Sequence, residues 1–387
     1  MILMSKDIPV LEIENYSCKI LKKELLPIAL RYDDVTYDDV IHNWAYMRAM
    51  DLGKTNAKQI MTVCGLKQHN PYVIAKAFHF ATLSDSYWMK EKDEIITWND
   101  VSLFRNPFNK AVSMTAISGE LPNIILTGRQ RIQTPEPMTR GMAAKTWIRD
   151  EFGNVWLCKI GAKELLADQI LDVLQIHHLH YEKCSDQEAV ELAGETRFAN
   201  ISKNGECIVK SRLMSSEDLA MVLFEDFSIY CDRNNINPYE WMLDHYPQEY
   251  AQMQAVDYIL ANNDRHEENW GLFMDSNSGE IIGFIPLYDH DQILSKDELV
   301  SQTIDAIGIP MLDTLPDSAQ YLDDTFGSKL AALLQSDVLD QNMRFRIEQV
   351  EEIFLDTHNI DQKLNKAVEH FTNQQHFSNT IQKGTER

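Results

Sequence analysis

The chain has 387 residues, of which 44% are hydrophobic and 25% charged, so it has the size and composition of a globular protein with two or three domains. Its formal net charge of −23 disfavours direct, sequence-independent binding of nucleic acid, because such binding depends on Lys and Arg side chains that neutralise phosphates. No apolar run reaches the roughly 20 residues that span a bilayer and the first residues do not resemble a secretory signal, so we expect a cytoplasmic protein without a membrane partner.

The first 120 residues read as a separate accessory domain that begins with a strand and continues with helices. Apolar residues recur at helical spacing between Asp38 and Leu52, which predicts a helix there. Residues 110–137 are rich in Ser, Thr, Gly, Pro and Asn, which predicts a linker. The remaining elements expected here are a strand at Ile8–Ile13, helices at 57–64 and 73–83, and a short strand at Ile124–Leu126.

From residue 138 the pattern favours strands, and past Arg212 it favours helices. The Asn204-Gly205 pair predicts a hairpin between 197–201 and 207–210, because this dipeptide suits a tight two-residue turn. The other elements expected in this part are strands at 139–148 and 155–160, helices at 163–175, from 215 onward, at 250–261, 319–326, 329–334, 343–355 and 361–371, and an antiparallel hairpin of 270–274 with 280–285.

Three polar side chains flank that last hairpin. Asp264 and Asn269 lie in the loop before its first strand, and Asp289 follows its second strand. A carboxylate and an amide that converge with a second carboxylate provide the oxygen ligands that Mg²⁺ prefers, and a further Asp could accept a proton from an attacking hydroxyl. We therefore select Asp264 and His266 as candidate catalytic residues and Asn269 and Asp289 as candidate metal ligands. The alternative is an Asx-rich loop that only caps the preceding helix.

Lys159 lies in an apolar strand, where an inward-facing ammonium needs an anionic partner. Glu164 or Asp168 on the following helix could supply it, and a lysine held in this way can bind nucleotide phosphates. The alternative is an edge-strand lysine that faces solvent. Gly141, between two strand-like segments, could place backbone amides against the phosphates, although single glycines in hairpins are common.

His177, His178 and His180, with Cys184, could suggest a metal site. Only His178 and His180 share a strand face, and the sequence shows no carboxylate that frames them. A surface cluster is therefore the preferred interpretation.

The segments 262–269 and 287–289 together resemble the catalytic and metal-binding loops of the HipA-like kinase family, which is similar to the CtkA-like bacterial kinases and more remotely to phosphoinositide kinases. The segments 141–148 and 156–159 resemble the ATP loop and lysine strand of the same family. The resemblance implies an α+β, bilobal protein-kinase-like fold. Its expected parts are an accessory domain at 1–120, a β-rich N-lobe at 121–213 and a helical C-lobe at 214–387.

The resemblance also implies residue roles. Asp264 would be the catalytic aspartate, Asn269 and Asp289 would hold Mg²⁺, Lys159 would bind ATP with Glu164 as its partner, and the Gly141 loop would cover the triphosphate. The implied activity is ATP- and Mg²⁺-dependent phosphorylation of Ser or Thr in a protein, with autophosphorylation and a small antitoxin as partner found in relatives. The alternatives are a pseudokinase that gates an interaction, transfer to a lipid or small molecule, and transfer of AMP. The kinase motifs do not specify the acceptor.

Overall fold

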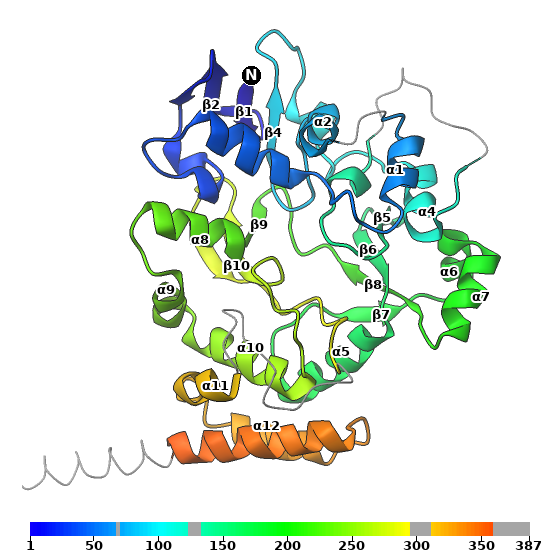
Figure 1. The fold of residues 1–387 in the computed structure, drawn as a ribbon, viewed down its shortest axis with the longest axis vertical. Coiled ribbons are helices and arrows are strands. Elements are labelled where there is room, and N and C mark those ends of the chain that lie inside the picture. The colour runs from blue at the N-terminus through cyan, green and yellow to red at the C-terminus, as the bar shows by residue number, and fades with distance from the viewer. Residues whose placement is uncertain (67–69, 123–132, 295–310, 359–387) are drawn as a thin grey trace, which may run out of the picture. The chain divides into compact units, whose positions relative to one another are not determined.

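The computed structural model describes residues 1–66, 70–122, 133–294 and 311–358 (Figure 1). The chain divides into two compact units, the first made of 1–169, 177–241 and 266–291 and the second of 170–176, 242–265 and 292–387. The predicted mixture of helices and strands is confirmed. The division into domains at 1–120, 121–213 and 214–387 stays a prediction. The expected strand at Ile124–Leu126 and helix at 361–371 lie outside the described residues.

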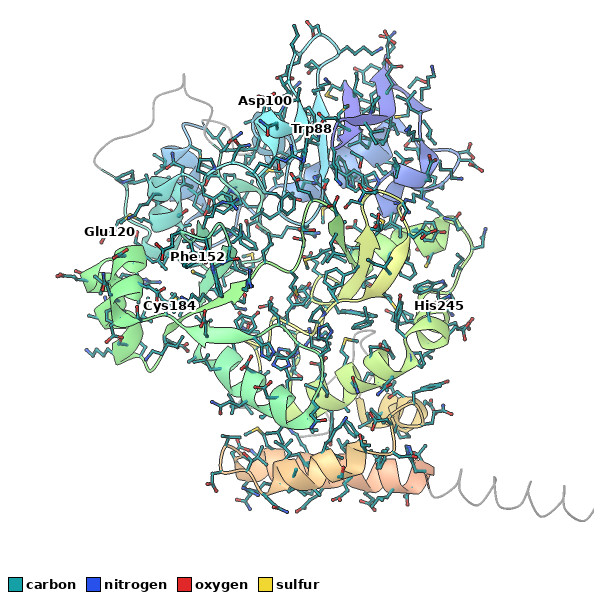
Figure 2. The ribbon with its side chains drawn as sticks, turned by 180° about the vertical axis from the view of Figure 1, so that it is seen from behind. Trp88, Asp100, Glu120, Phe152, Cys184 and His245 are labelled. Carbon is teal, nitrogen blue, oxygen red and sulfur yellow. The ribbon has the colours of Figure 1, made fainter. Side chains whose placement is uncertain are left out.

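The N-terminal sheet of the first unit is antiparallel, with strand order β3-β2-β1-β4. Trp88 of the edge strand β4 (Figure 2) is fully buried and belongs to one apolar cluster with Trp98 and Met4. The strand predicted at Ile8–Ile13 is confirmed as β2. The four strands are β1 (Ile2–Ser5), β2 (Ile8–Glu14), β3 (Ser17–Ile20) and β4 (Tyr87–Lys90).

Short helices and turns surround this sheet. The single helix expected from Asp38 to Leu52 is wrong: a π-helix is followed by a 3₁₀ turn, with Ala45 N–H bonding to the carbonyl of Val40. The linker expected at 110–137 is also wrong at its start, because the Asn109 side chain caps a helix there. The elements are η1 (Lys23–Leu25), η2 (Ile28–Leu30), η3 (Asp39–Trp44), η4 (Tyr46–Arg48), α1 (Ala57–Val63), α2 (Pro71–Ala77), α3 (Trp98–Val101), α4 (Lys110–Ser118) and η5 (Glu136–Met138).

A second antiparallel sheet has the order β5-β6-β8-β7. The predicted strand at 155–160 is confirmed, but the hairpin expected at Asn204-Gly205 is wrong. Gly205, with φ +76°, ends a helix instead, because a left-handed residue also terminates helices. The elements are β5 (Lys145–Arg149), β6 (Val155–Ile160), α5 (Ala162–Leu174), β7 (Tyr181–Lys183), α6 (Asp186–Ala193), α7 (Glu195–Lys203) and β8 (Ile208–Arg212).

The third sheet has the order β11-β10-β9 and contains the predicted hairpin, which is confirmed as β10 (Gly271–Asp275) with β11 (Ile281–Phe284). The helix expected from residue 215 is wrong, since β9 (Leu219–Leu223) pairs with β10 before α8 (Phe224–Arg233) begins. The hairpin turn packs tightly on the N-terminal part of the chain. Gly279 has φ +78°, a Cβ there would lie 2.0 Å from the carbonyl oxygen of Glu24, and Arg31 donates to the Gly279 carbonyl.

The second unit is helical. The Tyr258 hydroxyl donates to Gln349 at 2.5 Å, which joins α10 to the helix over 341–358. Among the described residues, every helix is too short or too polar to traverse a lipid bilayer. The elements are α10 (Pro247–Leu260), α11 (Met311–Ala319), α12 (Phe326–Leu334) and the helix at 341–358, with α9 (Pro238–His245) and α5 shared between the units.

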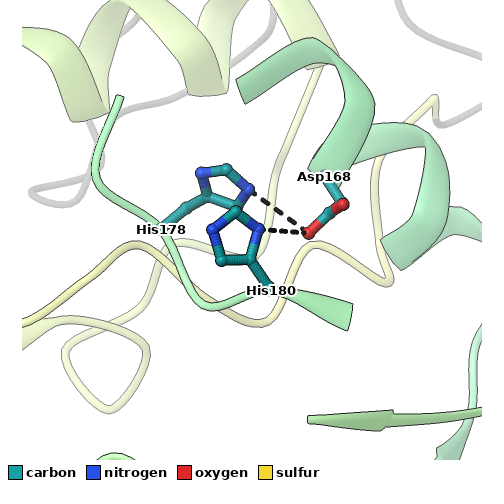
Figure 3. Close-up of side chains that lie close together, drawn as sticks. All are labelled: Asp168, His178 and His180. Atoms are coloured by element: carbon teal, nitrogen blue, oxygen red, sulfur yellow. Dashed lines mark hydrogen bonds and ion pairs between the residues drawn. The ribbon is translucent and has the colours of Figure 1, made fainter. Parts of the chain in front are cut away.

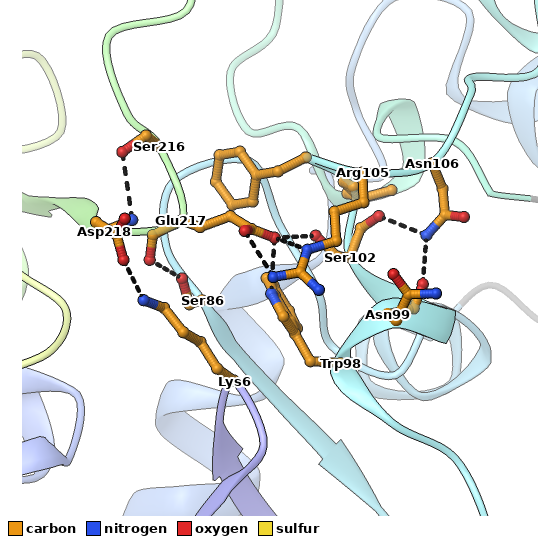
Figure 4. A network of polar contacts seen from close by, with 12 residues as sticks. Lys6, Ser86, Trp98, Asn99, Ser102, Arg105, Asn106, Ser216, Glu217 and Asp218 are labelled. Atoms are coloured by element: carbon orange, nitrogen blue, oxygen red, sulfur yellow. Dashed lines mark hydrogen bonds and ion pairs between the residues drawn. The ribbon is translucent and has the colours of Figure 1, made fainter.

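Glu217 links the segment before β9 to the N-terminal region (Figure 4). Its carboxylate accepts from Trp98 Nε1 at 2.8 Å, Ser102 Oγ at 3.0 Å, and Arg105 Nε and Nη2 at 2.6 and 2.9 Å. Trp98 is fully buried, so its indole N–H depends on this acceptor.

Replacing Glu217 with alanine should lower the free energy of unfolding by about 1–3 kcal/mol, because buried donors lose their acceptor. The neighbouring Asp218 pairs with Lys6, and its side chain is 71% exposed. Asp218→Ala should therefore cost at most about 1 kcal/mol. Urea denaturation of both variants measures the difference, and equal losses would contradict a structural role for the Glu217 contacts.

Candidate functional site

Lys159 is a buried lysine in the middle of the second sheet. Its side chain lies on β6, is 2% exposed and forms ion pairs with Glu164 of α5 and with Asp289. Asp291 lies farther off, 3.7 Å from Lys159 Nζ, and the ammonium stands 5.6 Å from the ring centroid of Tyr181. Although burial alone lowers the pKa of Lys159, attraction by Tyr181 and the carboxylates holds that pKa well above its usual value.

The carboxylates around Lys159 come from two places in the chain, α5 and the segment after β11. One oxygen each of Glu164, Asp289 and Asp291 lies within 4.8 Å of the others. The His290 amide donates to Glu164 Oε2 at 3.0 Å, which joins α5 to this segment, and Asp289 has a left-handed backbone with φ +60°. Such a set of oxygen donors fits a hard divalent cation such as Mg²⁺.

A second lysine, Lys145 at the start of β5, lies close to the predicted glycine. Gly141 has φ +88°, and a Cβ there would lie 2.5 Å from Lys145 Nζ. Lys145 is the register partner of Lys159 across β5 and β6, so both lysines lie on the same face of the sheet. Directly opposed like charges are unfavourable in a sheet, and an anion bound between them would relieve the repulsion.

Residues of the N-terminal region donate hydrogen bonds to the loop that contains Gly141. Lys54 is buried and donates to the carbonyl of Thr139 at 2.9 Å, and Thr55 N–H bonds to the carbonyl of Met142 at 2.9 Å. Burial, with the nearby charge of Lys145, lowers the pKa of Lys54 to about 7. The loop that contains Gly141 is therefore fixed at both ends of its turn by residues of the accessory region.

The other selected residues lie in the loop between α10 and β10. His266 is exposed, and its Nδ1 accepts from the Glu268 amide at 3.2 Å. Asn269 is buried in the first unit, and its amide donates to the His266 carbonyl at 2.9 Å. Asp264 belongs to the second unit, where its amide donates to Asn262 Oδ1 at 3.3 Å. The catalytic and metal-binding roles of these residues stay predictions.

The order and chemistry of these parts agree with a comparison against known families. Residues 135–375, more than half of the chain, match the phosphatidylinositol 3- and 4-kinase family. The chain belongs to this family. The match begins beside η5 and includes the lysine strand, the loop after α10 and the segment after β11. It confirms the predicted kinase resemblance and supports a phosphotransferase.

Two solved structures are similar to this chain. One is the proinflammatory kinase CtkA of Helicobacter pylori, with 13% sequence identity and a TM-score of 0.37, covering 57% of this chain and 95% of that one. The other is a chain in the toxin–antitoxin complex of HipA, HipB and operator DNA from Shewanella oneidensis MR-1, with 10% identity and a TM-score of 0.48, covering 92% and 96%. Both are bacterial proteins of the groups that the sequence resembles. No curated protein matches the chain significantly.

The chain also contains a buried ion pair that the sequence does not reveal. Arg265 donates to both oxygens of Asp257 on α10, with distances of 2.8 and 3.0 Å, and both side chains are 1% exposed. Asn262 Nδ2 donates to the same carboxylate at 2.8 Å. Asp257 thus anchors the chain on each side of Asp264. In the sequence, only the position of Asp257, eight residues before an arginine of the loop, could have suggested that it anchors this loop.

A second set of contacts supports the loop that contains Gly141. Arg140 bonds to Glu225 of α8 at 3.0 Å and to Glu268 of the loop before β10. The Tyr288 hydroxyl donates to the carbonyl of Glu268 at 2.7 Å. These bonds connect the residue before Gly141 to the segments that carry Asn269 and Asp289.

Proposed function

We propose that the chain is an ATP- and Mg²⁺-dependent Ser/Thr protein kinase of the HipA-like type. The observation that carries the proposal is the buried Lys159, which is paired with Glu164 and Asp289 inside the region that matches the kinase family. A buried lysine held by an acid of the following helix is the arrangement with which kinases orient nucleotide phosphates. Burying these charges lowers the free energy of unfolding unless they are fully compensated, so their presence is explained if they bind a ligand.

On the nucleotide side, Lys159 would donate to the phosphates while Glu164 holds the ammonium in place. Lys145, which shares the sheet face, would add a second positive charge, and the amides around Gly141 would cover the triphosphate. ATP binding would thereby offset the repulsion between the two lysines.

The cation would be held by Asp289 and Asn269, with Asp291 as a further carboxylate in reach of the same position. Bound there, Mg²⁺ would supply neutralisation of the phosphate charge. The residues themselves orient the oxygen ligands: the His290 amide fixes Glu164, and the left-handed backbone at Asp289 sets the direction of its carboxylate.

On the acceptor side, Asp264 would accept the proton of the substrate hydroxyl. The hydroxyl oxygen would bond to the γ-phosphorus while the bond from that phosphorus to the leaving ADP oxygen breaks. His266, two residues later, is the other residue of this loop selected as catalytic. A protein acceptor is favoured over a phosphoinositide because an anionic membrane attracts Lys and Arg, whereas this chain has a net charge of −23. A toxin role with a small partner protein would fit the same chemistry.

Incubation of the purified protein with γ-labelled ATP and Mg²⁺ tests the proposal. Label should enter the protein itself or a generic protein substrate such as casein, and phosphatidylinositol vesicles should remain unlabelled. Intact-mass analysis of the same sample separates a phosphoryl adduct from the much heavier adenylyl adduct. Binding of ATP without any transfer would favour a pseudokinase, and labelled lipid or an adenylyl adduct would contradict the proposed acceptor or the transferred group.

A further inference from the structure

A second group of metal-ligating side chains includes Asp168, one helical turn after Glu164 on α5. His178 and His180 lie just before β7, and Asp168 of α5 lies beside both of them (Figure 3). His178 Nε2 is 3.2 Å and His180 Nδ1 is 3.3 Å from the same oxygen, Asp168 Oδ1. The carboxylate that the sequence did not reveal therefore comes from ten residues before His178, and the surface-cluster interpretation is incomplete.

The spacing of these three atoms matches a transition-metal site. Zinc binds His nitrogen and carboxylate oxygen at about 2.0–2.2 Å in a tetrahedron, which places neighbouring ligand atoms about 3.3–3.5 Å apart. The two nitrogen-to-oxygen distances, 3.2 and 3.3 Å, are close to the lower end of that range, and the three ligand atoms lie within 4.8 Å of one another. The imidazole rings have centroids 4.4 Å apart and are inclined by 65°, so each directs a ring nitrogen to the carboxylate without stacking on the other.

Hydrogen bonding alone gives a crowded arrangement at Asp168. Its Oδ1 also accepts a hydrogen bond from the Tyr181 amide at 3.0 Å. The Tyr181 nitrogen and one ring nitrogen of each histidine therefore all lie close to one oxygen that has two lone pairs. With a metal ion present, neutral imidazoles would direct lone pairs to the ion, and the oxygen would need to accept only one N–H. His178 is buried, whereas the His180 side chain is 71% exposed, which gives solvent access to the fourth position.

We propose that Asp168, His178 and His180 form a site for a first-row transition-metal ion, with Zn²⁺ as the fitting example and water as the fourth ligand. This site shares no residue with the oxygen-donor group that suits Mg²⁺. The two groups should also prefer different ions, because imidazole ligands favour zinc and carboxylate groups favour magnesium. Asp168 follows Glu164 by one helical turn on α5. Leu179 N–H bonds to the Leu287 carbonyl at 2.9 Å, two residues before Asp289. The ion would thus join α5 to the segment that borders the Lys159 contacts.

The test measures metal binding by the full chain after removal of metal with a chelator, in excess Mg²⁺ so that the oxygen-donor group is occupied. Zn²⁺ is titrated against a chromophoric competitor, and Co²⁺ is used for its visible absorption bands. Wild type should bind one equivalent. His180→Ala and Asp168→Asn should weaken binding by more than about 100-fold, beyond the roughly 10–100-fold loss expected for a supporting residue.

Two further variants make the result specific. His177→Ala removes a neighbouring exposed histidine and should bind as wild type does. His180→Cys should retain binding, because a thiolate also ligates zinc. Circular dichroism checks that each variant is folded. Absence of stoichiometric binding by wild type, or unchanged binding by His180→Ala, would overturn the proposal, as would an equal loss in His177→Ala. The readout does not involve ATP turnover, so it is independent of the proposed kinase function.

Discussion

Replacing Asp264 with asparagine should lower the rate of phosphoryl transfer by about 10²–10⁴-fold, the range attributed to general base catalysis. Asparagine preserves the size of the side chain and its ability to accept a hydrogen bond, but it cannot take the hydroxyl proton. Binding of ATP should change little, because the residues assigned to the nucleotide lie on β5, β6 and α5 and in the loop around Gly141. Transfer of γ-labelled phosphate and the Kd of a fluorescent ATP analogue measure the two effects separately.

The neighbouring Glu267→Gln removes a carboxylate from the same loop and serves as the control. Its rate should stay close to that of wild type. If Asp264→Asn transfers phosphate as fast as wild type, the assignment of the base is wrong. If both variants are equally slow, the loop requires its overall charge, and Asp264 has no special role.

Asp257→Ala should lower the free energy of unfolding by about 3–5 kcal/mol, because breaking a buried ion pair leaves the remaining charge poorly compensated. The carboxylate accepts from Arg265 and Asn262, and both ion-paired side chains are 1% exposed. The loop around Asp264 should also lose its fixed position, so activity should fall even at temperatures where the variant is folded. Urea denaturation and transfer assays measure these two outcomes.

Asp324→Ala is the matched control in the same unit, since the side chain of Asp324 is 99% exposed. It should change the free energy of unfolding by at most about 0.5 kcal/mol. A loss below 1 kcal/mol in Asp257→Ala would show that water or another group replaces the carboxylate, and Asp257 would then have no anchoring role.

The chemistry of the lysine strand could be predicted because an ammonium in an apolar strand requires an anion. The sequence offered Glu164 and Asp168, which are separated by one helical turn on α5. The structure pairs Lys159 with Glu164 and places Asp168 against two histidines. Helical spacing could not distinguish the two acids, because the choice depends on how α5 lies against β6 and on residues 177–180.

Other parts of the site depend on register and on distant contacts, which a local pattern does not contain. Lys145 faces the same side as Lys159 only because β5 and β6 pair with those residues opposite each other. The Asn204-Gly205 pair fitted a hairpin turn as well as a helix end, and the preceding helix decided between them. The hairpin of β10 and β11 was predictable because two apolar runs flank a polar turn.

The contact of Gly279 with Glu24 and Arg31 bears on how this chain could be divided or extended. A polar hairpin turn is ordinarily a permissive position for an inserted tag, but this one has no room for even a methyl group. A chain shortened to the family match at 135–375 would also lack Glu24 and Arg31, which contact the turn at Gly279. We therefore expect a fragment bounded by the family match to be less stable than the full chain, because the turn before β11 contacts residues more than a hundred positions before the match begins.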